Sequence, residues 1–394
     1  MRTPNSISYI LNHLGEERGD YRNAVSPPIW QTSNFAMPNV ASMRSCVRDE
    51  LAHSFYTRGN NPTVEILRKK LAALEGAEDA LVFASGAAAI AAAVMTFVSA
   101  SEHIICVQKP YSWTRNLLGN LLKRFGVTVS FIDGTRIEHF AAALQANTKL
   151  IVLESPNSLT FELQDLAAVA KLAQARGIYT LLDNSFCSPL HQHAIGLGID
   201  LVAHSATKYL AGHSDVMAGV LCGSKALIEQ VFRGPFMTIG SLLGPHDAWL
   251  VLRGLRTLPV RLKQIGASTQ AVYEFLRTHP RITRVYYPLA ADFAQAALAR
   301  QQMGDFAGLI SIEVAADDFA AMESFVDALQ LFLIAASWGG YESLIMPILG
   351  FMDARSYRAG QGLPFTLVRL SIGLEEPAEL IADLAQALDR LSAR

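Results

Sequence analysis

Lys208 lies in a segment whose composition favours chemistry on an amine. The segment runs from Asp200 to Asp215 with the sequence DLVAHSATKYLAGHSD, so the lysine follows an apolar, strand-like piece and a cluster of hydroxyl residues. Burial among apolar residues lowers the pKa of a lysine, and a partly neutral amine can form a Schiff base with a carbonyl compound. The hydroxyls of Ser205 and Thr207 could hold a phosphate beside it. Taken alone, the segment predicts either a lysine that carries pyridoxal phosphate or a structural lysine with a buried aliphatic stem.

Three further groups suited to this cofactor follow other apolar runs. The turn Ala84–Ala87 opens an alanine-rich helix, whose first N–H groups and dipole favour a phosphate, although a bland tight turn would look the same. Tyr111 could stack on a flat heterocycle or simply pack. Asp183 could pair with a protonated pyridine nitrogen and keep the ring an electron sink, although a lone aspartate there is also a common helix cap.

The order of these groups along the chain is more informative than any one of them. Ligands of open α/β sheets bind at the carboxyl ends of the strands. The phosphate turn with Gly86 and Ala87, then Tyr111, Asp183 and Lys208 each end a successive element. Arg369, in the segment LVRLSIG, adds a guanidinium fork suited to an α-carboxylate. Together these residues favour the cofactor over the structural alternatives.

The elements that must position these groups alternate in type between residues 61 and 255. Short apolar runs at 80–83, 103–107, 127–131, 149–153, 178–183, 200–204 and 216–223 are separated by amphipathic helical stretches, the first of which ends at Gly76. This alternation predicts a large α/β domain with a mostly parallel sheet covered on both faces. Residues 256–394 look like a smaller α+β domain, with a helix at 260–279 and strands at 284–288, 308–314 and 367–376.

Residues 1–60 lack sustained periodicity and contain the turn-rich stretches PPIWQTSNF and YTRGNNPT. An arm of this length without its own core must lie on its own domain or on a neighbouring subunit.

Composition bounds the class of protein. The chain has 394 residues with 51% hydrophobic and 17% charged residues, which argues against disorder. A net charge of −2 predicts neither a nucleic-acid nor a membrane partner. The four cysteines are scattered, the start of the chain does not resemble a signal peptide, and the longest apolar run, at 86–100, is short for a membrane span. We therefore expect a cytoplasmic protein.

Two motifs carry a resemblance to a known family. HSATKYLAGHSD is similar to the lysine motif, and YTRGNNPT to the Y-x-R-x-x-N-P-T arm, of the Cys/Met-metabolism family of pyridoxal-phosphate enzymes. That family includes cystathionine γ-synthase, cystathionine β- and γ-lyases and methionine γ-lyase, and the resemblance extends from about Tyr56 to Glu376. It implies the aspartate aminotransferase-like fold (fold type I). It also implies that Tyr56 and Arg58 reach the phosphate of a neighbouring subunit's cofactor, within a homotetramer built as a dimer of dimers.

Within the family, three stretches resemble bacterial cystathionine β-lyases. ESPNSLTFEL has Ser158-Leu159-Thr160 where γ-type enzymes usually have Asn-Pro, and SWGGYESL (337–344) and VRLSIGLEE are similar to the β-lyase substrate segments. The resemblance assigns Ser337, Trp338 and Arg369 to substrate binding. The cofactor residues that it implies are Tyr56, Arg58, Gly86, Ala87, Tyr111, Asp183, Ser205, Thr207 and Lys208, with Lys208 and Tyr111 as catalytic residues.

Two positions depart from the family pattern. Phe236 stands where a tyrosine is expected near the site, which leaves substrate preference open. Tyr111 is followed by Ser112-Trp113, without the Gly-Cys expected of methionine γ-lyases.

The expected reaction is β-elimination from L-cystathionine, which gives homocysteine, pyruvate and ammonia. Lys208 would remove the α-proton, and Asp183 would keep the ring nitrogen protonated. Alternatives with the same cofactor are cystathionine γ-lyase or γ-synthase, cysteine desulfhydrase and racemase chemistry. A metal enzyme built on His191, His193, His204 and His213 lacks a fourth ligand pattern and a general-base signature. A non-catalytic protein with this fold is the remaining alternative.

Overall fold

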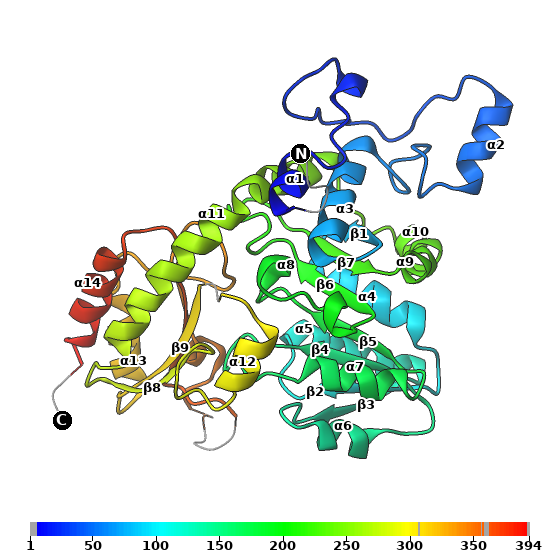
Figure 1. Cartoon of the computed structure of the whole chain (residues 1–394). Coiled ribbons are helices and arrows are strands. Elements are labelled where there is room, and N and C mark those ends of the chain that lie inside the picture. The colour runs from blue at the N-terminus through cyan, green and yellow to red at the C-terminus, as the bar shows by residue number, and fades with distance from the viewer. Residues whose placement is uncertain (1–5, 306–307, 356, 358–361, 392–394) are drawn as a thin grey trace. The chain divides into compact units, whose positions relative to one another are not determined.

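The computed structural model describes residues 6–305, 308–355, 357 and 362–391 (Figure 1). The chain forms two compact units that are described separately below. The first comprises residues 1–158, 162–211 and 215–256, and the second comprises 159–161, 212–214 and 257–394. The sequence predicted a boundary near residue 255, and the longest stretch of the second unit begins at Thr257.

The first unit is built on a seven-stranded sheet with the order β1-β7-β6-β5-β4-β2-β3. Only β7 runs antiparallel to its neighbours, so the expected mostly parallel sheet is confirmed. Apart from the edge strand β3, the strands are buried along most of their length, which explains their continuous apolar runs. Their bounds are β1 Asp79–Phe83, β2 His103–Val107, β3 Thr128–Ile132, β4 Thr148–Glu154, β5 Tyr179–Asp183, β6 Leu201–Ser205 and β7 Gly219–Gly223.

The first helix after the N-terminal arm ends at the expected signal. α3 (Pro62–Glu75) has Asn61 as its N-cap and ends at Gly76 with φ +74°, a left-handed conformation that glycine adopts without strain. The helical stretch expected between β2 and β3 consists of α5 (Ser112–Asn116), a π-helical turn at 117–121 and a 3₁₀ turn at 122–125. The other helices are α4 Gly86–Phe97, α6 Ile137–Ala143, α7 Leu166–Gln174, α8 Ser188–His191, α9 Lys225–Val231 and α10 Met237–Ile239.

Part of the N-terminal arm packs on its own unit. It contains α1 (Ile7–Asn12) and α2 (Val40–Arg48). The buried Lys70 of α3 lies 3.1 Å from the Glu16 carboxylate, and its ammonium donates hydrogen bonds to the carbonyls of Ile10 and Leu11. By contrast, no residue of α2 is buried.

The second unit has a five-stranded sheet with the order β10-β11-β12-β9-β8. It is antiparallel except for the β10–β11 pair. β10 and β11 were not predicted, and helix α11 (Pro245–Leu276) begins earlier than expected, within the first unit. The remaining bounds are β8 Ile282–Tyr286, α12 Ala296–Gln302, β9 Leu309–Val314, α13 Phe319–Asp327, β10 Leu333–Ile334, β11 Leu344–Pro347, β12 Leu367–Ser371 and α14 Pro377–Leu388.

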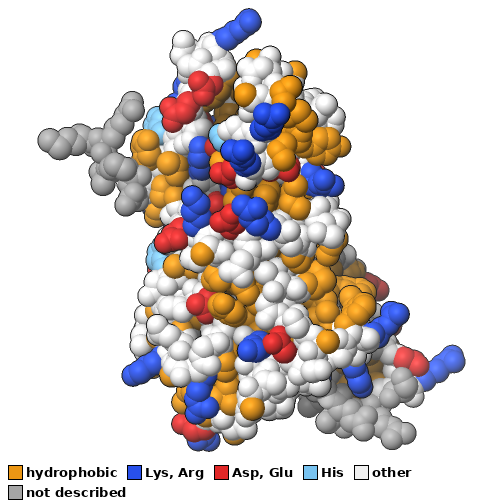
Figure 2. Space-filling view, turned by 90° about the vertical axis from the view of Figure 1, so that its right-hand side faces the viewer, with side chains coloured by type: hydrophobic (Ala, Val, Ile, Leu, Met, Phe, Trp, Pro, Cys, Tyr) orange, Lys and Arg blue, Asp and Glu red, His pale blue; other side chains and the backbone are white. Residues whose placement is uncertain are grey.

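The surface mixes charges of both signs with hydrophobic side chains. Figure 2 shows Lys and Arg side chains interspersed with Asp and Glu on one face, with hydrophobic side chains gathered in several places. Large exposed hydrophobic residues include Val25, Trp113, Phe125, Met217 and Phe351. Among the described residues, no helix is long and apolar enough to cross a membrane.

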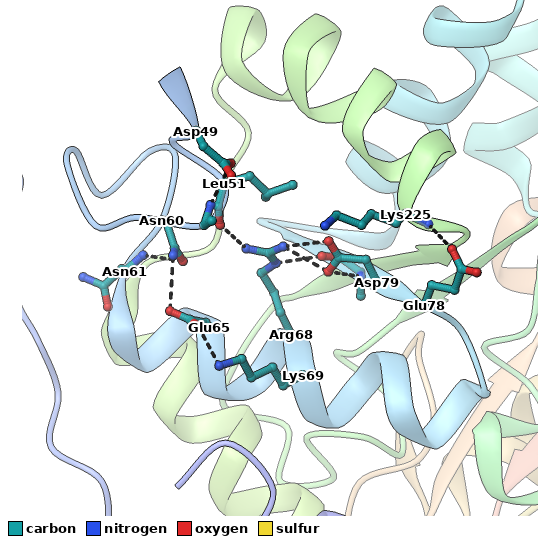
Figure 3. A network of polar contacts seen from close by, with 12 residues as sticks. Asp49, Leu51, Asn60, Asn61, Glu65, Arg68, Lys69, Glu78, Asp79 and Lys225 are labelled. Atoms are coloured by element: carbon teal, nitrogen blue, oxygen red, sulfur yellow. Dashed lines mark hydrogen bonds and ion pairs between the residues drawn. The ribbon is translucent and has the colours of Figure 1, made fainter. Parts of the chain in front are cut away.

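Arg68 of α3 joins three segments of the first unit (Figure 3). Its guanidinium donates to the carbonyls of Ala80 (2.7 Å) and Leu51 (3.3 Å) and to both carboxylate oxygens of Asp79 (3.0 and 3.2 Å). The side chain is buried. Arg68 therefore ties α3 to the start of β1 and to the segment that precedes Tyr56.

Candidate cofactor site

Asp183, the last residue of β5, is held by a neighbouring serine. Its Oδ1 accepts hydrogen bonds from the Ser185 N–H (3.0 Å) and the Ser185 hydroxyl (2.6 Å). In the described part of the chain Oδ2 accepts none, so it is available to the N–H of a protonated pyridine ring. Burial raises the pKa of Asp183, whereas the bonds from Ser185 and the charges of His204 and Lys208 lower it.

The same serine hydroxyl reaches the residue that ends β6. The Ser205 N–H donates to Ser185 Oγ at 2.6 Å. The backbone of Gly86 in turn lies against Ser205, since a Cβ added to Gly86 would come within 3.0 Å of the Ser205 Cα and Cβ atoms. The structure therefore brings together three of the expected elements: the phosphate turn, Ser205 and Asp183.

The phosphate turn opens α4 in a standard capped geometry. Ser85 is the N-cap, and its side chain accepts from the Ala88 N–H at 3.1 Å. The first N–H groups of an α-helix have no partner within the helix, so those of Gly86 and Ala87 are suited to phosphate oxygens. Gly86 is buried and Ala87 exposed, which places the end of this helix at the edge of the packed core.

Lys208 follows β6 and is half-buried. Its backbone N–H donates to the Ser205 carbonyl at 3.1 Å, and its charge lowers the pKa of Asp183, so the lysine lies close to the pyridine-nitrogen residue. The Thr207 hydroxyl donates to the Ala218 carbonyl (3.2 Å) and accepts from the Ala218 N–H (3.0 Å). The hydroxyl hydrogen of Thr207 is therefore used within the protein rather than turned toward a phosphate.

Tyr111 precedes α5 and is tied to a residue that was not assigned a role from the sequence. Its backbone N–H donates to Glu154 Oε2 at 2.5 Å. Burial and the charges of Asp183 and Glu154 raise the pKa of the Tyr111 phenol, which keeps it protonated at neutral pH. Glu154 and Ser185 are the two residues that the sequence reasoning left out of the site. Their position just at or after a strand end was the signal that could have identified them.

Tyr56 and Arg58 contact each other rather than the residues above. The Arg58 guanidinium carbon lies 5.7 Å from the centre of the Tyr56 ring, and both side chains are exposed. Within the described residues neither side chain makes a hydrogen bond. Their expected role at a neighbouring subunit's cofactor stays a prediction.

The three residues expected to bind substrate lie together in the second unit. Arg369 of β12 is only 4% exposed, and its guanidinium donates to the Ser337 carbonyl at 3.0 Å. The guanidinium carbon also lies 4.8 Å from the centre of the Trp338 ring, a cation–π distance. Ser337 adopts φ +97°, an uncommon backbone conformation for a residue other than glycine.

The structure also shows where Phe236 and the histidines considered as metal ligands lie. Phe236 is part of the hydrophobic core of the first unit, where its ring packs edge-on against Phe83 (5.2 Å between centres) and stacks with Phe232 (5.7 Å). The histidines do not assemble into a metal site, because no group of three or more His, Cys, Asp or Glu residues in the described ranges is placed to hold an ion. His204 is instead bonded to Glu75, with Nε2 2.7 Å from Oε2.

The donor set of the first unit fits pyridoxal phosphate: a lysine, a carboxylate with one oxygen available, a helix N-terminus and an aromatic ring. With the mostly parallel seven-stranded sheet, it defines a pyridoxal-phosphate-dependent enzyme of fold type I. Residues 9–389 match the family model described as Cys/Met metabolism PLP-dependent enzyme, and the chain belongs to that family.

The similar proteins carry several different names. The L-methionine gamma-lyase of Pseudomonas putida is 38% identical over 381 residues, which cover 95% of each chain. The cystathionine beta-lyase of Lactococcus lactis subsp. cremoris is 36% identical over 391 residues, covering 98% of this chain and 99% of that one. The solved structure of cystathionine gamma-lyase from Lactobacillus plantarum complexed with L-serine has a TM-score of 0.90 and 34% identity, and covers 99% of this chain and 100% of that one. The comparisons thus give the cofactor and the class of carbon–sulfur chemistry, while the reaction varies among the relatives.

Proposed function

We propose that the protein cleaves L-cystathionine by β-elimination to homocysteine, pyruvate and ammonia. The observation that carries this proposal is the cluster of Arg369, Ser337 and Trp338. A buried guanidinium held by a carbonyl and an aromatic face is suited to binding an α-carboxylate. The Ser-Trp pair beside it belongs to the SWGGYESL segment, which resembles cystathionine β-lyases, and one relative carries that name.

Each residue of the site has a distinct task in this reaction. When bound, pyridoxal phosphate supplies an electron sink for the charge that develops on the substrate's α-carbon. Asp183 Oδ2 would accept the ring N–H and keep it protonated. The Lys208 amine, which would also anchor the cofactor as a Schiff base, removes the α-proton. Tyr111 would cover the ring, and the first N–H groups of α4 would bind the phosphate.

A second candidate is γ-elimination, since relatives of similar identity are named L-methionine gamma-lyase. The Ser112-Trp113 sequence after Tyr111 counts against methionine as the substrate. The burial of Phe236 in the core places this departure from the family among packing residues, so it does not favour either reaction.

Incubation with L-cystathionine, followed by identification of both products, tests the proposal. Pyruvate with homocysteine is the expected outcome, whereas oxobutyrate with cysteine would show γ-elimination and contradict it. Cystathionine recovered with an inverted α-carbon and without oxo acid would indicate racemisation. Lys208→Ala should abolish product formation, and Lys225→Ala, at an exposed position after β7, is the matched control. Substantial turnover by Lys208→Ala would refute the role of this lysine.

We also propose a cytoplasmic location. All four cysteines are free and three of them are buried, as expected in a reducing compartment.

A further inference from the structure

Glu154 and the half-buried Asp183 form a carboxyl pair at one edge of the sheet. They are the last residues of β4 and β5 and occupy directly paired positions in the parallel register. Paired residues of neighbouring parallel strands lie about 4.8 Å apart with their side chains on the same face. Glu154 is only 6% exposed. The mechanism proposed above uses Asp183 but gives Glu154 no task.

The neighbours of Glu154 provide hydrogen bonds but no positive charge. Its Oε2 accepts from the Tyr111 N–H (2.5 Å), and its Oε1 accepts from the Ser158 N–H (3.1 Å). The other titratable groups that face it are the Cys106 thiol of β2 and the Tyr111 phenol, and both have raised pKa values and stay neutral. No ion pair of Glu154 occurs among the described residues.

The positive charges of this region act on Asp183 instead. His204 and Lys208 both lower the pKa of that carboxyl, and His204 is itself bonded to the carboxylate of Glu75. Two buried carboxyls that share a site do not both ionise readily. Burial raises the pKa of both carboxyls, but His204 and Lys208 oppose this rise at Asp183. At Glu154 the charge of Asp183 adds to the effect of burial and raises the pKa to about 8, so Glu154 holds a proton at neutral pH.

We propose that Glu154 is a positioning residue that holds a proton before the cofactor binds and releases it to solvent when the protonated ring pairs with Asp183. The ring N–H at Oδ2 compensates the Asp183 charge, which removes the main electrostatic reason for Glu154 to stay neutral. An ionised Glu154 is the stronger acceptor for the Tyr111 and Ser158 N–H groups. Cofactor binding thereby fixes the backbone of the loop that carries the stacking ring.

The sign of the pH dependence follows from the proton count. The cofactor-free chain binds one proton more than the loaded chain below about pH 8, so acid must weaken cofactor binding. Equilibrium dialysis of the full chain at several pH values would give the dissociation constant of pyridoxal phosphate. The dissociation constant of the wild type divided by that of Glu154→Gln should fall by up to about tenfold for each unit by which the pH rises toward 8. Above pH 8 this ratio should be constant. The pH dependence that comes from titration of the cofactor itself is the same for both proteins and therefore cancels in this ratio.

Two variants serve as controls. Glu162→Gln removes a carboxylate of the same loop that is paired with Lys109 outside the carboxyl pair, and it should keep the wild-type pH dependence. Glu154→Asp keeps a titratable group, so its dissociation constant divided by that of Glu154→Gln should again depend on pH. A ratio that is constant with pH would overturn the proposal.

Infrared spectroscopy of the unchanged chain gives a test that needs no variant. The C=O stretching band of a buried protonated carboxyl should be present in the cofactor-free protein at neutral pH and absent after loading. A band that is absent before loading, or that persists after it, contradicts the proposal. Neither measurement depends on which carbon–sulfur bond is broken, so their failure is distinguishable from failure of the proposed function.

Discussion

The Ser185 hydroxyl serves two partners at once, donating to Asp183 Oδ1 and accepting from the Ser205 N–H, both at 2.6 Å. Ser185→Ala removes both bonds, and a hydrogen bond to a charged group contributes about 1.5–3 kcal/mol. We therefore expect pyridoxal phosphate to bind about tenfold more weakly or worse, as measured by dialysis and by the visible absorption of the loaded enzyme. Ser185→Thr keeps the hydroxyl and should restore binding. Unchanged affinity in Ser185→Ala would show that the bridge does not support the site.

The Arg369 fork should matter for substrate and not for cofactor. A lysine cannot reproduce planar, two-pronged recognition of a carboxylate and would lose the packing on Trp338. Arg369→Lys should therefore raise KM for the amino-acid substrate about tenfold or more, with unchanged cofactor affinity. Arg284→Lys, at an exposed position over the Tyr286 ring in the same unit, is the matched control. An equal loss of cofactor from Arg369→Lys would place this residue in a structural role instead.

At the scale of elements, the contact between β7 and the phosphate turn leaves no room for a side chain. A Cβ added to Gly219 would lie 2.0 Å from the Ser85 carbonyl oxygen and 2.6 Å from the Gly86 nitrogen. Gly219→Ala must displace the first turn of α4, so we expect loss of cofactor binding together with a lower melting temperature. Gly196→Ala has no atom within 4 Å of the added carbon and should behave as wild type. A fully loaded Gly219→Ala protein would refute this tight fit.

Arg68 and Lys69, neighbours on α3, should differ sharply in their contribution to stability (Figure 3). Arg68 is buried and bonded to Asp79, Ala80 and Leu51, whereas Lys69 is half-exposed and pairs with Glu65 one turn away. Removing one partner of a buried ion pair costs about 3–5 kcal/mol, and an exposed helical pair contributes about 0.5 kcal/mol or less. Denaturant unfolding should therefore show a large loss for Arg68→Ala and almost none for Lys69→Ala. Similar losses in the two variants would contradict this assignment.

Sequence patterns predicted the elements whose signals are local. Strands buried on both faces appear as apolar runs, and α3 is marked by Asn61, Pro62 and Gly76 at its ends. The antiparallel direction of β7 was not predicted, because a run of apolar residues carries no information on direction. β10 is two exposed residues long and leaves no periodic pattern. The π-helical turn at 117–121 lies within a stretch that was expected to be helical, but the sequence pattern did not predict the change of helix type.

The sequence predicted those residues of the site that lie at or shortly after the end of a strand. Asp183, Lys208 and Gly86 were identified in this way, and the structure brings their elements together. The bond between Glu154 and the Tyr111 backbone depends on tertiary packing, which a single sequence does not show. The use of the Thr207 hydroxyl by Ala218 likewise follows from the pairing of strands and not from the motif.

For the whole molecule, the N-terminal arm bears on assembly. α2 presents Val40, Met43 and Val47 at helical spacing, and all three are exposed. Tyr56 and Arg58 lie further along the same arm, and among the described residues their side chains make no hydrogen bond to the expected phosphate residues. We propose that this arm completes the site of a neighbouring subunit, in a homotetramer built as a dimer of dimers.

Mixed subunits test whether sites are shared. Lys208→Ala and Arg58→Ala subunits should each be inactive alone, but a hybrid pair contains one site with neither change. Random pairing should restore up to about a quarter of wild-type activity. Lys208→Ala mixed with Asp183→Ala, two changes on the same side of a site, should stay inactive. No recovery in the first mixture would mean that each chain builds its site alone.

The pairing of β1 with β7 also has a consequence for the protein's biosynthesis. β1 and the phosphate turn emerge early from the ribosome, but β7 is the strand that joins β1 to β6, the strand ending at Ser205. Until the chain has been made past Gly223, the turn that binds the phosphate has no sheet to hold it beside Asp183 and Lys208. Pairings between strands distant in sequence form late in folding. Pyridoxal phosphate is therefore expected to bind only after most of the first unit has been translated. A shortage of this cofactor during synthesis would leave a folded chain without cofactor rather than a chain arrested in folding.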